Sequence, residues 1–153
     1  MKKRVGFAVI FAATVSAGLA MVAGAQGTRQ YYGGWNFHSQ NRYYYRSYYY
    51  KPAPSFTAFR HHYALYFPAR PQHVYFYNPY RQVYWGRCPA KYEGEPGYSM
   101  LAEAARKPRL DQIPESAFPK PSPPPPIPDS TDNVRMDLPP DGLPTDAGLP
   151  PGS

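Results

Sequence analysis

The sequence predicts a chain that is mostly irregular or disordered around a small antiparallel β-meander, made of a β-hairpin plus one strand, with a short helix and no large globular core. Two observations lead to this prediction. After the first 25 residues, Leu, Ile, Val and Phe supply only 17 of 128 positions, fewer than a conventional core needs. Outside the low-complexity arm over residues 26–55, runs of aromatic and β-branched residues, which favour strands, are confined mainly to residues 59–67, 72–77 and 82–87.

Residues 1–25 read as a cleavable secretory signal peptide. Basic residues at positions 2–4 precede an apolar stretch over 5–22, and Ala23-Gly24-Ala25 gives the small-x-small pattern of a cleavage site. We therefore expect cleavage between Ala25 and Gln26, and export to the periplasm, the cell surface or the extracellular space. No stable membrane span is expected after cleavage. The alternative is an uncleaved transmembrane anchor, since 18 apolar residues are close to the minimum spanning length.

Three regions follow the signal peptide. Residues 26–55 form a Tyr-rich, basic, low-complexity arm, 56–118 a small β-rich unit with a short helix, and 119–153 a Pro-rich acidic tail that we expect to be disordered. Within the arm, Tyr43–Lys51 reads YYYRSYYYK. Consecutive Tyr residues on a strand would point to both faces, so no single core could bury them. The arm is therefore expected to be exposed and mobile.

The β-rich unit is predicted from three runs and one turn. Gln72–Tyr77 and Gln82–Arg87 are expected to pair across a turn at Asn78–Arg81, with Phe59–Phe67 as the third strand. Helix formers over Tyr98–Lys107 predict a short helix that Pro108 would end. The residues expected to be buried are apolar and lie in these strands: Leu65, Phe67, Val74, Phe76, Val83 and Trp85.

Charge is divided sharply along the chain. Residues 26–92 contain nine Lys or Arg and no acidic residue, whereas 93–153 contain five basic and ten acidic residues. A basic aromatic segment suits a polyanionic partner. Attraction between the two halves of the same chain explains the pattern equally well.

Aromatic rings and guanidinium groups in the β-rich unit are the candidate binding groups, because they can stack on sugars and meet anionic groups. The alternative is that these tyrosines only build the core and surface. Expected partners are cell-wall or surface polysaccharide and other copies of the chain; export makes nucleic acid an improbable partner. The candidate binding residues are Arg60, Tyr63, Arg70, Tyr75, Tyr77, Arg81, Tyr84 and Trp85.

The sequence offers no catalytic residues, metal ligands or cofactor motif. All ten acidic residues lie at or after Glu93, mostly in the expected tail, where they could not hold a fixed separation. One alternative site would use His61, His73 and Cys88 for metal binding or catalysis. His61 and His62 are adjacent, so on a strand they would face opposite ways. The single cysteine is expected to be structural.

Four blocks carry a resemblance to known proteins. They are YYYKPAPSFTAFRHHYALYFPARPQHVYFYNPYRQVYWGRCP at Tyr48–Pro89, GYSMLAEAARK at Gly97–Lys107, IPESAFPKP at Ile113–Pro121 and DLPPDGLP at Asp137–Pro144. In their order and spacing they resemble an uncharacterised family of predicted secreted bacterial proteins rich in Tyr and Pro. The resemblance implies a shared exported scaffold and supplies no activity.

These observations favour an exported, non-enzymatic protein that binds an anionic or carbohydrate polymer at the cell envelope or outside the cell. Two alternatives stay open. One is a self-associating structural surface protein that uses its Tyr clusters, and the other is an extracytoplasmic metal-binding or catalytic domain.

Overall fold

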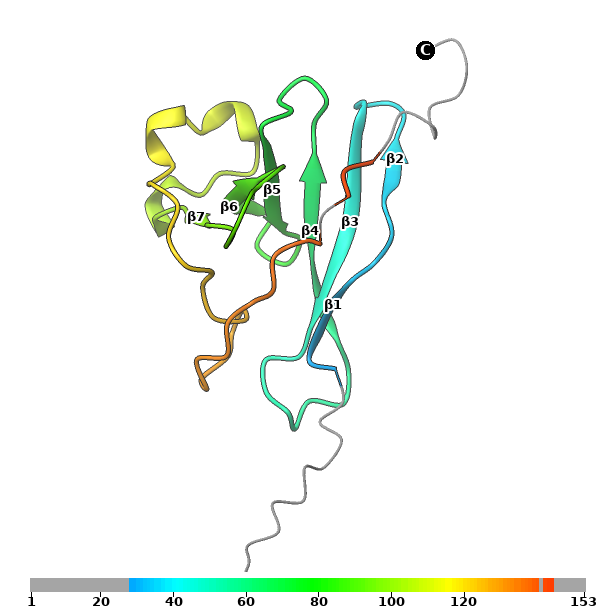
Figure 1. The fold of residues 1–153 in the computed structure, drawn as a ribbon, viewed down its shortest axis with the longest axis vertical. Coiled ribbons are helices and arrows are strands. Elements are labelled where there is room, and N and C mark those ends of the chain that lie inside the picture. Colours follow the sequence, from blue (N-terminus) through cyan, green and yellow to red (C-terminus); the bar gives the residue numbers. More distant parts are fainter. Residues whose placement is uncertain (1–27, 141, 145–153) are drawn as a thin grey trace, which may run out of the picture.

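The structure, a computed structural model, describes residues 28–140 and 142–144, and one antiparallel sheet dominates it (Figure 1). The expectation of a mostly disordered chain is therefore wrong. The predicted signal peptide and its cleavage site at Ala25 lie outside the described residues. The strands are β1 (Gln30–Tyr32), β2 (Asn36–His38), β3 (Tyr43–Tyr50), β4 (Arg60–Tyr66), β5 (His73–Asn78), β6 (Val83–Pro89) and β7 (Ser99–Met100).

Neighbouring strands follow the order β1-β3-β4-β5-β6-β7, and β2 also pairs with β3. The predicted hairpin is confirmed as β5 and β6, and the predicted third strand is confirmed as β4. The Asn78 side chain fixes the turn between β5 and β6, because its Oδ1 accepts hydrogen bonds from the backbone N–H groups of Tyr80 (2.9 Å) and Arg81 (3.1 Å).

The Tyr-rich segment predicted as a mobile arm is instead the long strand β3, which pairs with β1, β2 and β4. Its tyrosines do point to both faces, as the strand period requires. The prediction failed because the sheet has a core on each face. Tyr48 and Tyr50 are fully buried on one face, and Tyr43 and Tyr45 are half-buried on the other.

One face of the sheet, which we call the tail face, is covered by the C-terminal segment. Ile127 and Met136 from this segment are 1% and 2% exposed and pack with sheet residues. The backbone of Ile127 donates to Val134 over 2.8 Å, which closes the segment into a loop. Figure 1 shows this orange-to-red segment crossing the sheet near β4 and β3. The expectation of a disordered tail is therefore wrong over residues 119–140, because a few spaced apolar side chains suffice to dock it.

The opposite face, which we call the turn face, is covered at β5 and β6 by three short 3₁₀ turns. They are η1 (Glu103–Ala105), η2 (Leu110–Gln112) and η3 (Glu115–Ala117). The α-helix predicted over residues 98–107 is wrong: its start pairs with β6 as β7, so sheet pairing overrides helix propensity there. No helix in the described part of the chain is long and apolar enough to cross a membrane.

The predicted core is confirmed in part. Leu65, Val74, Phe76 and Trp85 are buried, and they divide between the two faces. Phe67 and Val83 are only half-buried. Tyrosine supplies much of the remaining core, which explains how the chain folds with so few aliphatic residues.

Candidate functional site

A hollow of about 510 Å³ opens on the turn face beside the 3₁₀ turns. We call it the tyrosine trough. Leu65 and Tyr84 are buried at its base, and its other tyrosines are half-buried. The residues that line it are His38, Asn41, Tyr43, Tyr45, Tyr63, Leu65, Tyr77, Tyr84 and Pro108.

Strand register brings the trough tyrosines together. Residues at every second position of neighbouring strands share a face, and Tyr63 on β4 pairs directly with Tyr77 on β5, which in turn pairs with Tyr84 on β6. The rings of Tyr45 and Tyr63 meet edge to face, with centroids 6.0 Å apart. The rings of Tyr77 and Tyr84 do the same at 5.1 Å. The result is a wall of aromatic faces and edges held on regular strands.

No residue that lines the trough is Lys, Arg, Asp or Glu. Burial, followed by the neighbouring Tyr45, Tyr63 and Tyr77, raises the pKa of Tyr43. Burial also raises the pKa of Tyr84. These two hydroxyl groups therefore stay protonated at neutral pH and can donate as well as accept hydrogen bonds. The trough suits an uncharged, hydroxyl-bearing surface better than a polyanion.

Three of the eight candidate binding residues meet in the trough: Tyr63, Tyr77 and Tyr84. Sequence reasoning missed Tyr43 and Tyr45, because it assigned them to a mobile arm. Their spacing of two on a Tyr-rich run was the signal that could have found them, since it places both on one face of a strand.

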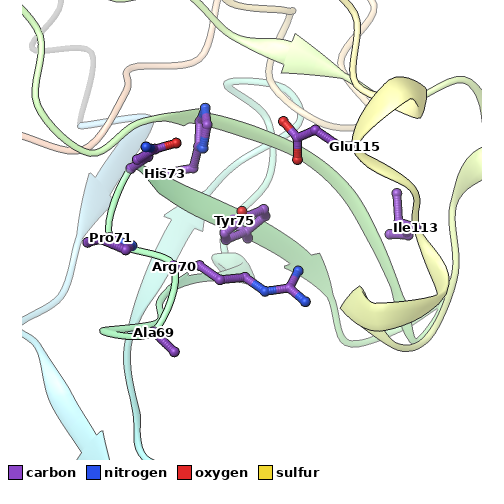
Figure 2. Close-up of a pocket in the computed structure, with 8 residues that line it drawn as sticks. Ala69, Arg70, Pro71, His73, Tyr75, Ile113 and Glu115 are labelled. Carbon is purple, nitrogen blue, oxygen red and sulfur yellow. The ribbon is translucent and has the colours of Figure 1, made fainter.

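Two further candidates, Arg70 and Tyr75, line a neighbouring hollow of about 520 Å³. Figure 2 shows the Arg70 side chain extending past Tyr75 toward Ile113, with Glu115 on the far side of the hollow. Glu115 is already engaged: Nη1 of the buried Arg87 donates to its Oε2 over 2.9 Å. Arg70 makes no ion pair among the described residues and is exposed, so it is an accessible cation beside the tyrosines.

The remaining two arginine candidates are paired with carboxylates of the second half of the chain. Arg60 lies 3.0 Å from Asp129, and Arg81 forms an ion pair with Glu103. The pairs Arg29–Asp132 and Arg87–Glu115 repeat the pattern. The segregation of charge along the sequence therefore serves, at least in part, to join the two halves of the chain.

Trp85 lies on the tail face, away from the trough. The pairing of β5 with β6 shifts by one residue at a β-bulge after Phe76, so that Tyr84 faces the trough and both Trp85 and Gly86 face the tail side. This shift could not be seen in the sequence, where QVYWGR reads as a regular alternation.

The alternative metal site does not assemble. His61 and His73 contact aromatic rings of the turn face, at Tyr63 and Tyr75, whereas Cys88 lies in the core of the tail face. Within residues 28–140 and 142–144, no group of three His, Cys, Asp or Glu residues is close enough to hold a metal ion. Burial raises the pKa of the Cys88 thiol to about 12, which keeps it protonated and unreactive.

Comparisons of the chain with protein-family models, with curated proteins and with solved structures found no match.

Proposed function

We propose that the protein is an exported, non-enzymatic binding protein of the cell envelope or extracellular matrix, and that its tyrosine trough holds a chain of polysaccharide. The single observation that supports this is the hollow of about 510 Å³ lined by tyrosines from four strands without a charged residue. Sugar rings offer apolar C–H faces for stacking and hydroxyl groups for the phenol oxygens, so both kinds of surface in the trough find a partner.

In this role the bound polymer is a carbohydrate, and it is held mainly by ring stacking and hydrogen bonds. Four arginines of the basic half already pair with carboxylates of the acidic half, which leaves less positive charge for a polyanion. Electrostatic binding weakens as salt rises, whereas ring stacking does not. Retention that persists at high salt thus separates the two modes.

The test is co-sedimentation of the purified protein with insoluble cell-wall polysaccharide at low and high salt. Tyr63→Ala is expected to weaken retention by about tenfold, because it removes one stacking ring. Tyr63→Phe keeps the ring and should retain most of the binding. Tyr80→Ala is the matched control, since Tyr80 is 60% exposed and lies outside the trough. Absence of retention at low salt, or equal retention by Tyr63→Ala and the unmodified protein, would refute the proposal.

Self-association is a second candidate function. It is favoured by an exposed aromatic cluster at β1, which lies at one edge of the sheet. Tyr31 is 44% exposed and stacks on Tyr49 with centroids 4.8 Å apart, and the 36% exposed Phe59 meets Tyr31 edge to face at 5.0 Å. Sedimentation velocity over a range of concentrations tests this role. A larger species that Tyr31→Ser abolishes, and Tyr80→Ser does not, would support it; a monomer at every concentration would exclude it.

A further inference from the structure

A third hollow, of about 300 Å³, lies on the tail face and is therefore separate from the tyrosine trough. His62 of β4 and Trp85 of β6 form part of its sheet side, and residues 125–130 of the C-terminal segment lie over it. Its volume is at the lower end of the range of about 300–1,000 Å³ found for small-molecule sites.

Three buried polar atoms without a hydrogen-bond partner belong to residues that line this hollow: Nδ1 of His62, Nε1 of Trp85 and Oγ of Ser130. They are half of the six such atoms in the described part of the chain. His62 and Trp85 are only 4% and 7% exposed. Buried polar atoms are nearly always satisfied, so three unsatisfied ones on residues that line one hollow favour a polar occupant. The atoms themselves are closed to solvent, so the side chains must turn slightly to reach that occupant.

All three atoms can donate a hydrogen bond. The indole Nε1 of Trp85 is a donor only, and the hydroxyl of Ser130 can turn to donate. The hydroxyl of Tyr50 lies 3.1 Å from Nε2 of His62. When Tyr50 donates to Nε2, the proton of the neutral imidazole is on Nδ1, and Nδ1 becomes the third donor. A ligand with several acceptor oxygens would accept hydrogen bonds from all three donors.

The charges around the hollow favour an anion. Arg81 and Arg106 both line it, and they share one carboxylate, that of Glu103, which lies 2.8 Å from Arg106. Asp129 also lines the hollow, but it is paired with Arg60 at 3.0 Å. Two guanidinium groups and one carboxylate thus line the hollow. The remaining positive charge suits a carboxylate, which accepts several hydrogen bonds at once.

We propose that this hollow binds a small hydroxylated carboxylate, of the size of one sugar acid, between the sheet and the C-terminal segment. The carboxylate oxygens accept from Trp85 and His62 near the two arginines, and they also accept from the hydroxyl of Ser130 on the C-terminal segment. Because the site lies on the other face of the sheet, it does not depend on the polysaccharide-binding role of the trough.

D-galacturonate and D-galactose are matched probes, because they differ at C6, where one carries a carboxylate and the other a hydroxymethyl group. Each is titrated into the purified protein while the indole N–H signal of Trp85 is followed by ¹⁵N NMR. We expect a saturable shift of this signal with galacturonate and none with galactose. Ser130→Ala should weaken binding by about tenfold, since it removes one hydrogen bond to a charged group, whereas Thr131→Ala next to it should not.

Three results would overturn the inference. They are the absence of a shift with galacturonate, an equal response to galactose, and a crystal structure grown with galacturonate in which only water bridges the three atoms. Tyr63→Ala separates this site from the trough: it should weaken polysaccharide retention by about tenfold and leave the response to galacturonate intact.

Discussion

The ring of Tyr98 occupies the space that a side chain at Gly86 would need. Tyr98 is fully buried there and meets Phe76 edge to face at 5.3 Å. The absence of a side chain at Gly86 thus lets Tyr98, which lies between the loop over residues 90–97 and β7, insert its ring into the core of the tail face.

Gly86→Ala is therefore expected to destabilise the protein by about 1–3 kcal/mol, because the new methyl group overlaps the Tyr98 ring in a packed core. Urea unfolding followed by tyrosine and tryptophan fluorescence measures the change. Gly34→Ala is the matched control, since nothing lies within 4 Å of a side chain added there. Equal stability of the two variants would contradict the packing described for Tyr98.

Ile127→Ala should destabilise the protein by about 2–5 kcal/mol if the C-terminal segment is part of the folded unit. Ile127 is 1% exposed, whereas Val134 from the same segment is 40% exposed and serves as the control. Val134→Ala should leave the free energy of unfolding within about 0.5 kcal/mol of the unmodified protein. Thermal unfolding by circular dichroism compares the two. A neutral Ile127→Ala would show that the segment is detached.

His62 makes stability depend on pH. Burial, followed by the charge of His61, lowers the pKa of His62 to about 3, against an ordinary value of 6.5. Between these values only the unfolded chain takes up the proton, so the contribution of the neutral ring is fully present above pH 6.5 and is lost as the pH falls. Below pH 6 the free energy of unfolding should fall by up to about 1.4 kcal/mol per pH unit from this group.

Urea unfolding at several pH values between 5 and 6.5 measures that slope. His62→Phe should remove the part of this slope that comes from the uptake of one proton by the unfolded chain. The substitution also lowers stability at all pH values, because it leaves the Tyr50 hydroxyl unpaired. His61→Phe, on the opposite face of the same strand, should retain the slope due to His62. An unchanged slope in His62→Phe would contradict the burial of a neutral imidazole.

Cys88 is expected to resist alkylation in the folded protein. Its thiol is 1% exposed, and burial holds its pKa at about 12, so almost no thiolate forms at pH 8. Iodoacetamide labelling followed by mass spectrometry should show modification only after unfolding in urea. A cysteine introduced at the exposed Ser116 should be labelled in the folded state. Labelling of Cys88 at a similar rate would mean that its core opens readily.

The sequence predicted the local parts of this fold better than the long-range ones. The hairpin of β5 and β6 follows from strand formers on either side of Asn78, all within a few residues of one another. Strand β3 could not be recognised in this way, because Tyr43–Tyr50 is stable only between partners on both sides and with covers on both faces. The scarcity of aliphatic residues suggested disorder, yet tyrosine fills the core in their place.

The candidate site was predicted to a similar extent. Tyr63 and Tyr77 were found because they belong to recognisable strands, and Tyr43 was missed along with β3. Arg60 and Arg81 were expected to be available to a ligand, but carboxylates from distant segments pair with them. Such partners lie 69 and 22 residues away along the chain, where local sequence patterns hold no information about them.

The ion pair between Arg29 and Asp132 joins residues 103 positions apart, and Gln30 donates to the backbone of Arg135 over a similar span. Ribosomes add about 5–20 residues per second, so about 5–20 s separate the synthesis of β1 from that of its C-terminal cover. During this time the tyrosine-rich strands are complete but lack the segment that shields them. The nascent chain therefore passes through a partly folded stage in which aromatic surface is exposed. A chaperone or rapid transfer across a membrane would protect it from aggregation at that stage.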